Sequence, residues 1–453
     1  MSRLLIATMP AAGHVGPLVP LALELVARGH DVSWYTGEAY RDTVEATGAR
    51  FFPHVHAPDR DVAQMDLEFP ERAELKGFKK FEFDMREVFI KAVPGQVADL
   101  EALLPEVRPE AIVAEPGMAG AAKLIDQRHG IPWATCNISA FAMRSRDTAP
   151  FGLGLRPMPS RLGRVRDGVL NALIYRTLYR GIDREYHAMR ARLGMESEGG
   201  VFDTTLSPHL YLQPTVPSFE YPRSDLAPQV HFVGPLLPPV PDGFQPPAWW
   251  DEMLADPRPV VLITQGTVAT DPDELLLPAL EALRDEPVQA IAVTGGPDPA
   301  ELPARPANAR VERFVPFAAL MPHVAVLVSN GGYGGLQYAL AHGVPLIVSG
   351  TTEEKPELVA RVNWSGVGVG IRAQRPGPER IRGAVRTVLA DPGYRARAEA
   401  MAAEMAGYEG ARRAADLVER LTNTLSSADR NPTASAPVST AASPRLDTST
   451  RGG

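Results

Sequence analysis

A proline-rich segment divides this 453-residue chain into two parts, each with an alternating series of strands and helices. In the first part, the order strand, loop, helix, strand occurs over residues 4–35 and again over residues 110–136. This order requires parallel strands joined by crossover helices. We therefore predict an α/β protein in which a mostly parallel sheet, covered by helices, accounts for the residues up to about 220.

The segment from Val233 to Pro247 contains too many prolines to form a helix or a strand, because each proline removes a backbone donor. A second α/β series begins after it, and the chain beyond Leu421 is rich in Ser, Thr, Ala and Pro. The sequence thus predicts an N-terminal domain over 1–220, an interdomain linker over 221–250, a C-terminal domain over 251–421 and a disordered tail over 422–453.

Charge and hydropathy exclude several classes of protein. The formal net charge is -8 and no helix or arm is basic, so the chain lacks the positive surplus that nucleic-acid binding requires. No apolar run reaches the roughly 18 residues of a membrane helix, and the N-terminus does not resemble a signal peptide. We expect a soluble, cytoplasmic protein without stable membrane insertion. The single cysteine, Cys136, lies in a predicted strand and should pack inertly.

His14 is a candidate general base. It lies in Gly13-His-Val-Gly-Pro17, just after the first predicted strand, and open α/β sheets bind ligands at that end of their strands. A histidine with a pKa near neutral can accept a hydroxyl proton. Spacing alone leaves a packing or capping histidine equally open, and the two glycines match a dinucleotide-binding loop only weakly. Glu115 also follows a predicted strand and would orient His14 if the two are neighbours.

A glycine-rich turn in the second half is a candidate diphosphate site. The run Asn330-Gly-Gly-Tyr-Gly-Gly335 follows a predicted strand and precedes a helix, so its backbone N–H groups should lie at a helix N-terminus. Thr267 follows the predicted strand 260–264 and offers a hydroxyl to a phosphate. Glu354 and Lys355 follow a further strand, where charged side chains suit sugar hydroxyls.

Asp271 and Asp273 match the D-x-D pattern of metal-dependent sugar transferases. In the run Asp271-Pro-Asp-Glu274, however, an N-cap Asp, a proline at N1 and a Glu at N3 explain all four residues, whereas a metal site explains two. The run Asp298-Pro-Ala-Glu301 repeats the capping pattern. We therefore expect helix starts here and no bound metal.

Together these motifs resemble the family 1 glycosyltransferases, inverting enzymes of GT-B fold that include bacterial macrolide and polyketide glycosyltransferases. The resemblance extends to about residue 421 and implies two Rossmann-like domains facing across a cleft. The motifs that carry it, in order, are Gly13-His-Val-Gly-Pro17, Phe314-Val-Pro316, Asn330-Gly-Gly332, Gly343-Val-Pro345 and Glu354-Lys355.

The resemblance implies a role for each matched residue. His14 would deprotonate the acceptor hydroxyl, and Glu115 falls where the family has an orienting Asp. Phe314 would stack on the nucleobase and the backbone of Val315 would bind the base edge. The diphosphate would be held by Thr267 and by the turn of Asn330, Gly331, Gly332, Tyr333, Gly334 and Gly335, with Gly13 close to the donor. Glu354 and Lys355 would contact sugar hydroxyls, where many members have Asp-Gln.

Three departures bear on the donor. The family's phosphate-binding His is Asn330 here, which donates a hydrogen bond but cannot become cationic. The Glu expected on the ribose is Tyr338, and the Gln that often follows the Val-Pro step is Phe317.

The expected reaction is an inverting, metal-independent transfer from a UDP- or dTDP-sugar to a hydroxyl of a hydrophobic small molecule such as a polyketide, macrolide or phenol, in antibiotic or related biosynthesis. The nucleotide sugar is a co-substrate, and no cofactor is expected. A non-catalytic glycosyltransferase partner and a nucleotide-sugar epimerase remain as alternatives. Several apolar side chains would belong either to the acceptor site or to the core: Phe69, Phe78, Phe83, Phe89, Phe141, Met143 and Phe151.

Overall fold

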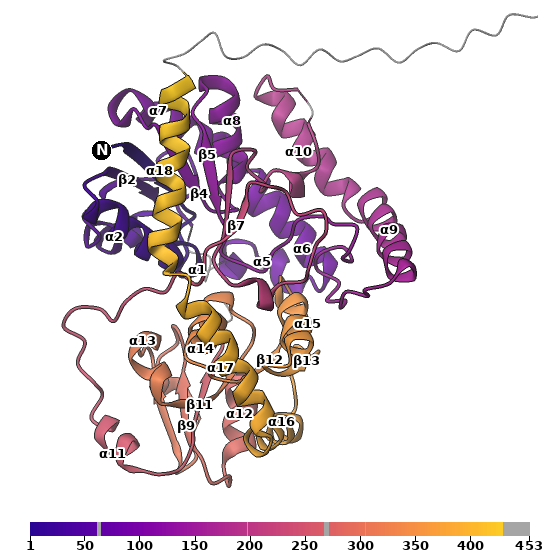
Figure 1. The fold of residues 1–453 in the computed structure, drawn as a ribbon. Coiled ribbons are helices and arrows are strands. Elements are labelled where there is room, and N and C mark those ends of the chain that lie inside the picture. The colour runs from indigo at the N-terminus through magenta and orange to yellow at the C-terminus, as the bar shows by residue number, and fades with distance from the viewer. Residues whose placement is uncertain (61–64, 197, 267–270, 304, 429–453) are drawn as a thin grey trace, which may run out of the picture.

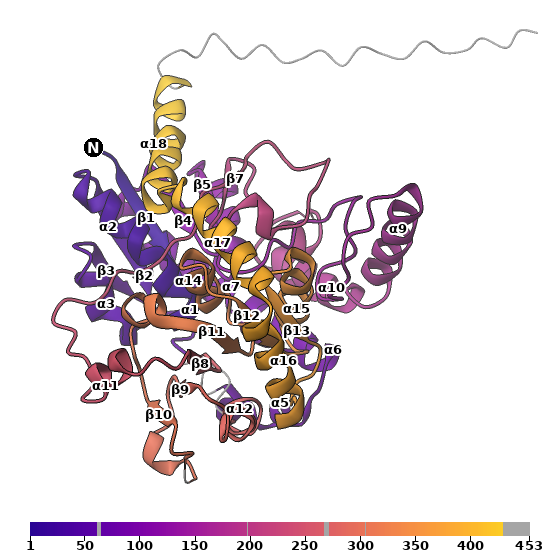
Figure 2. The same ribbon diagram turned by 60° about the horizontal axis from the view of Figure 1, so that its bottom comes forward.

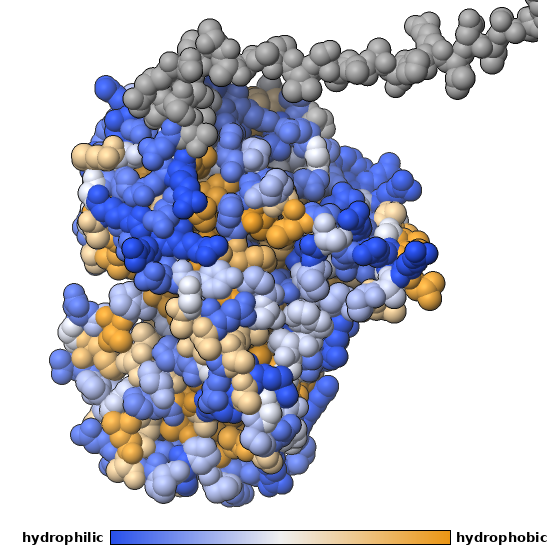
Figure 3. All heavy atoms as spheres, in the orientation of Figure 1, coloured by the Kyte–Doolittle hydropathy of each residue, from blue (hydrophilic) through white to orange (hydrophobic). Residues whose placement is uncertain are grey.

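The computed structural model describes residues 1–60, 65–196, 198–266, 271–303 and 305–428. It contains two parallel sheets, one above the other in Figure 1, each covered by helices. The outline of the molecule narrows between the two lobes (Figure 3). The predicted α/β class and two-sheet architecture are confirmed.

The first sheet has the strand order β3-β2-β1-β4-β5-β6-β7. Its interior strand β1 (Arg3–Ala7) is apolar from Leu4 onward and fully buried there, as expected for a parallel strand covered on both faces. The other strands are β2 (Asp31–Thr36), β3 (Arg50–Pro53), β4 (Ala111–Ala114), β5 (Trp133–Cys136), β6 (Leu210–Gln213) and β7 (Val230–Phe232). Burial raises the pKa of Cys136 in β5 to about 12, which fits the inert packing predicted for it.

The helices of the first lobe are α1 (Ala12–Val15), α2 (Val19–Ala27), α3 (Arg41–Glu45), α4 (Met65–Glu68), α5 (Pro70–Glu74), α6 (Phe78–Asp84), α7 (Val93–Val107), α8 (Ala119–His129), α9 (Arg161–Arg176) and α10 (Arg180–Arg192). A π-helical segment, Met85–Ile90, continues α6. Phe141 is fully buried against Tyr211, and Phe69, Phe78 and Phe89 pack on the core, so these four belong to the core.

The second sheet has the order β10-β9-β8-β11-β12-β13. Its strands are β8 (Val260–Thr264), β9 (Gln289–Val293), β10 (Ala309–Glu312), β11 (Val324–Ser329), β12 (Leu346–Ser349) and β13 (Gly368–Ile371). Its helices are α11 (Trp250–Ala255), α12 (Leu276–Leu283), α13 (Phe317–Leu320), α14 (Tyr333–Ala341), α15 (Lys355–Ser365), α16 (Pro378–Ala390) and α17 (Pro392–Ala406).

The last helix, α18 (Gly410–Ala428), crosses back to the first lobe and lies beside α2 (Figure 1). Its Ala414, Ala415 and Val418 pack into the apolar cluster that contains Leu21, and Arg28 of the first lobe forms ion pairs with Asp416 and Glu419. Figure 2 shows the same placement from another side. Residues 410–421 had been predicted to belong to the C-terminal domain, and this contact corrects that prediction because the helix buries its apolar face on the other sheet.

Two predicted boundaries also differ. The linker was predicted over 221–250, but β7 lies within it and extends the first sheet, because Val230–Phe232 pairs with β6. Within this predicted linker, all of which the structure describes, residues 221–229 and 233–249 contain no helix or strand. The tail was predicted to start at Thr422, whereas α18 continues to Ala428; residues 429–453 lie outside the described part of the chain.

A buried ion cluster joins the two lobes. Arg361 on α15 is fully buried and pairs with Glu220 of the first lobe at 2.8 Å and with Glu357 of its own helix at 2.9 Å. The same guanidinium donates to the carbonyl of Phe141 at 3.2 Å.

Replacing Arg361 by Met should lower the free energy of unfolding by about 3–5 kcal/mol, because two buried carboxylates lose their partner. Urea unfolding of both proteins measures the difference. The matched control is Arg386→Met, which breaks a pair of the exposed Arg386 with Glu286 at 2.7 Å and should change the stability little, because solvent screens the pair. Equal losses in the two variants would show that the buried cluster does not hold the lobes together.

No described helix is long and apolar enough to cross a membrane.

Candidate active site

Both sheets place candidate residues where their strand order reverses. In the first sheet the reversal lies between β1 and β4, with Ala7 level with Ala114, so the segments that carry His14 and Glu115 leave adjacent strands side by side. In the second sheet it lies between β8 and β11, with Thr264 level with Ser329. Ligands of open α/β sheets bind at such points, beyond the carboxyl ends of the strands.

His14 and Glu115 form a pair. His14 Nδ1 lies 3.0 Å from Glu115 Oε2, as an ion-pair contact rather than a linear hydrogen bond. The side chain of His14 is 24% exposed and that of Glu115 is fully buried, so part of the imidazole stays accessible. His14 belongs to the short helix α1, not to a loop as predicted, because the chain turns helical at Ala12.

Backbone amides hold Glu115 in place. Its Oε1 accepts from the N–H of Met9 at 3.0 Å, and its Oε2 accepts from the N–H of Gly117 at 2.7 Å. A Cβ at Gly117 would lie 2.8 Å from Glu115 Oε1 and 2.5 Å from the Met9 sulfur, so only glycine fits there. The carboxylate is therefore fixed before any substrate binds.

The pKa of His14 is raised above 6.5. Burial acts to lower it, but the charge of Glu115 and its contact with the ring, together with the charge of Glu354, outweigh burial. A raised pKa makes the imidazole a stronger base for a hydroxyl proton.

The glycine-rich turn lies at the N-terminus of α14. The amide of Gly331 donates to Ser329 Oγ at 3.1 Å. The first hydrogen bond within the helix runs from the amide of Leu336 to the carbonyl of Gly332, so the amides before Leu336 have no partner inside the helix. The N–H groups of the first helical turn point away from the helix body, as at any helix start. A Cβ added at Gly332, Gly334 or Gly13 would meet no atom within 4 Å, so open space lies in front of each.

Tyr333 differs from the rest of the predicted donor set. Its side chain is buried, and its hydroxyl accepts a hydrogen bond from Gln213 of the first lobe at 2.9 Å. The side chain therefore packs in the domain interface, and only its backbone remains available to a phosphate. Gly335 packs against the ring of Phe317.

Phe314 and Val315 lie at the rim of the same lobe. Phe314 is 60% exposed, unusual for an aromatic side chain, while Val315 is buried in the core beneath it. Asn330 is also buried. Thr267 lies outside the described residues.

Glu354 and Lys355 occupy the start of α15. Burial and the neighbouring Glu353 charge raise the pKa of Glu354, while the charges of Lys355 and His14 act in the opposite direction. The mutual influence of Glu354 and His14 means that the second lobe brings a carboxylate close to the candidate base. Glu353 has a positive φ of 54°, which is strained for a residue with a side chain.

Four residues near these motifs have functions in the fold. Tyr338, where the resemblance expects a ribose-binding Glu, donates from its hydroxyl to the carbonyl of Pro238 in the linker at 2.6 Å. Gln265 accepts from the amides of Leu275 and Leu276 and so caps α12. Asp271 and Asp298 act as predicted, each accepting an amide two residues on, but they start a turn and a short 3₁₀ helix. No cluster of three metal-binding side chains occurs among the described residues.

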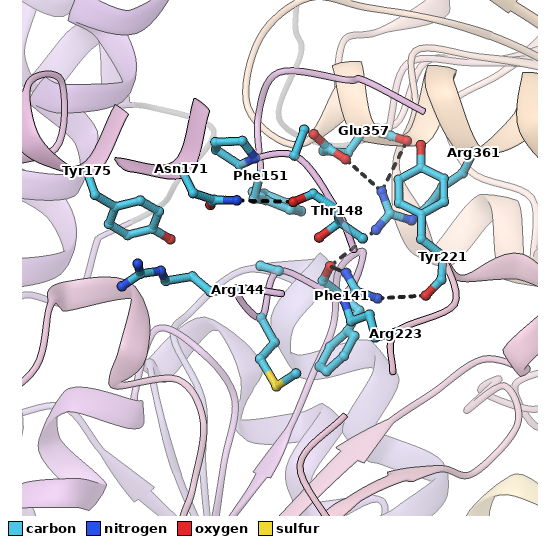
Figure 4. A pocket seen from close by; sticks show the side chains of 14 residues that line it. Phe141, Arg144, Thr148, Phe151, Asn171, Tyr175, Tyr221, Arg223, Glu357 and Arg361 are labelled. Carbon is cyan, nitrogen blue, oxygen red and sulfur yellow. Dashed lines mark hydrogen bonds and ion pairs between the residues drawn. The ribbon is translucent and has the colours of Figure 1, made fainter. Parts of the chain in front are cut away.

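Helix α15 holds a loop of the first lobe through Glu357, which Figure 4 shows paired with Arg361. Glu357 Oε1 accepts from the amides of Gly152 and Gly154, both at 2.8 Å, and a Cβ at Gly154 would collide with the Pro356 carbonyl at 2.5 Å. The cavity beside this loop, lined partly by Phe151 and Met143, measures about 10 Å³. This volume is far below the roughly 300 Å³ of a small-molecule site.

Comparison with known proteins identifies the family. Residues 274–421 match the family described as "Erythromycin biosynthesis protein CIII-like, C-terminal domain". The 4'-demethylrebeccamycin synthase of Lentzea aerocolonigenes is 48% identical over 422 residues, which cover 93% of this chain and 99% of that protein. The UDP-glycosyltransferase 2 of Phaeomoniella chlamydospora is 30% identical, covering 92% of this chain and 95% of its own length.

Among solved structures, the calicheamicin glycosyltransferase CalG4 superposes with a TM-score of 0.71 at 22% identity, covering 93% of this chain and 98% of that one. At that identity the match concerns the fold. The relatives similar over nearly their whole length establish that the chain belongs to the family 1 glycosyltransferases of GT-B fold, natural-product enzymes that transfer a sugar from a nucleotide donor.

Proposed function

We propose that this glycosyltransferase catalyses an inverting, metal-independent transfer from a UDP- or dTDP-sugar to a hydroxyl of a hydrophobic small molecule. The observation that carries the proposal is the 3.0 Å pair of His14 and Glu115 at the switch point of the first sheet, with a carboxylate of the second lobe close by. One relative is named a demethylrebeccamycin synthase and another a demethyllactenocin mycarosyltransferase, which supports a natural-product acceptor.

The reaction would be a single displacement. His14 Nε2 accepts the acceptor proton as the acceptor oxygen bonds to the anomeric carbon, and the bond from that carbon to the β-phosphate oxygen breaks on the opposite face. Glu115 stabilises the imidazolium that forms. The amides at the start of α14 and the helix dipole stabilise the leaving diphosphate.

Incubation of the chain with UDP- and dTDP-sugars and a panel of phenolic and macrolide acceptors tests the proposal. NMR of the product should show an anomeric configuration opposite to that of the donor. A product of retained configuration would overturn the mechanism, and conversion of the donor sugar without any acceptor would indicate an epimerase.

Phe314 is the residue we propose to stack on the nucleobase. Replacing it by alanine should weaken UDP binding roughly 5- to 150-fold, since base stacking on an aromatic ring contributes about 1–3 kcal/mol. Calorimetric titration with UDP measures the change. Leu254→Ala, which truncates another exposed apolar side chain of this lobe, should leave the affinity unchanged; the same affinity in Phe314→Ala would place the base elsewhere.

A further inference from the structure

Lys355 is an unusual lysine, because it is only 7% exposed and yet its ammonium pairs with no buried carboxylate in the part of the chain that the structure describes. Among the described residues, its ammonium contacts Glu353 Oε2 at 3.2 Å and Thr352 Oγ1 at 3.4 Å. The side chain of Glu353 is 41% exposed, and Glu353 is the residue with the strained positive φ. An ammonium group has three donors, and burying its charge is costly unless it is paired. This arrangement suits a lysine that receives an anionic partner from outside the chain.

Because Gly350 and Gly331 have no side chains, the side chain of Lys355 can lie beside the turn that precedes α14. A Cβ at Gly350 would lie 2.6 Å from Lys355 Cβ and 2.7 Å from its Cδ, so no side chain fits there. A Cβ at Gly331 would lie 3.4 Å from Lys355 Cγ. The aliphatic part of Lys355 therefore runs between the turn at Asn330 and the end of β12.

The turn itself lacks a formal positive charge. Its amides carry only the partial charge of a helix N-terminus, and Asn330 stays neutral at every pH. A nucleoside diphosphate is an anion whose negative charge grows on the phosphate oxygen as the sugar leaves. Lys355 is the cation whose side chain packs directly against this turn.

We propose that Lys355 binds the diphosphate of the donor and stabilises it as the leaving group, a role that rests on the proposed function. Without donor, Glu353 holds the ammonium; when the diphosphate binds, its oxygens take the place of the Glu353 carboxylate. During transfer the bond between the anomeric carbon and the phosphate oxygen breaks, and the electron pair stays on that oxygen beside Lys355. The acceptor proton goes to His14, so Lys355 remains protonated throughout.

Titration of Lys355→Gln with uridine, UMP, UDP and a UDP-sugar tests the assignment. The variant should bind UDP about 10- to 100-fold more weakly than the unmodified chain, because a charge-assisted contact is lost, and should bind uridine with unchanged affinity. A second substitution, Asn330→His, should restore part of the UDP affinity below pH 6, where the new imidazole is charged. Lys123→Gln, which removes a lysine paired with Glu198 on the far lobe, should change none of these values.

The outcomes separate the possible roles. Unchanged UDP affinity in Lys355→Gln overturns the proposal, and a loss seen with the UDP-sugar but not with UDP assigns Lys355 to the sugar instead. An equal loss of uridine and UDP affinity means that the variant has damaged the whole site, and this also overturns it. If the unmodified chain binds no nucleoside diphosphate at all, the proposed function fails first.

Discussion

Replacing His14 by alanine is expected to lower the rate of sugar transfer by about 10²- to 10⁴-fold, the usual contribution of a general base. The Nδ1 of His14 contacts Glu115 at 3.0 Å, which leaves Nε2 as the nitrogen that can accept the proton. Without it, the acceptor hydroxyl must lose its proton to water. UDP affinity should stay within about twofold of the unmodified value, because His14 belongs to the opposite lobe.

Initial rates at saturating donor and acceptor measure this effect, and calorimetry measures UDP binding. His209→Ala is the matched control, because His209 pairs with Asp126 at 2.9 Å on the same lobe but away from the switch point. The control should transfer at the normal rate. Normal turnover by His14→Ala itself would show that the base has been assigned wrongly.

Replacing Glu115 by glutamine should change both the rate and its pH dependence. In the unmodified chain the raised pKa of His14 means that the neutral base form predominates only at a pH above 6.5, so the rate should rise with pH through that region. Glutamine removes the charge that raises this pKa, whereas burial, which lowers it, remains. The rising limb should therefore move to lower pH.

At high pH, where His14 is neutral in both proteins, Glu115→Gln should transfer about 10²-fold more slowly, because the imidazolium formed during the reaction loses its counter-charge. The measurement is kcat/KM from pH 5 to 9, combined with an NMR titration of the His14 ring. Asp126→Asn, which removes the partner of His209, should leave the profile unchanged. If the rising limb of the pH–rate profile lies at the same pH in Glu115→Gln as in the unmodified chain, Glu115 does not set the pKa of His14.

The strands were largely predictable because each depends on a short apolar run. Val260–Thr264 has the predicted bounds, and the predicted runs 4–35 and 110–136 match β1 to β2 and β4 to β5 within one residue at their outer ends. Helix α17 begins at Pro392, because Asp391 caps it from the preceding position. The open α/β class follows from the order of these elements, which is a local property of the chain.

Some side-chain contacts could not be predicted because the partners are distant in sequence. Tyr333 belongs to a motif that indicates phosphate binding, yet its ring packs against the first lobe and its hydroxyl meets Gln213. Tyr338 was identified only as a departure from the family pattern, whereas its hydroxyl holds the linker. The apolar face of α18 is readable in the sequence, but the surface that it covers is not.

By itself, the sequence determined the elements, their order and the residue types at the ends of the strands, because short-range propensity and apolar periodicity decide these. The tertiary structure decided that β1 and β4 are neighbours, so that His14 meets Glu115. It also decided that the side chain of Lys355 lies against Gly331 and Gly350, beside the turn that precedes α14. The reason is physical: sheet order and close packing depend on the whole chain, and these contacts set both the pKa of His14 and the burial of Lys355.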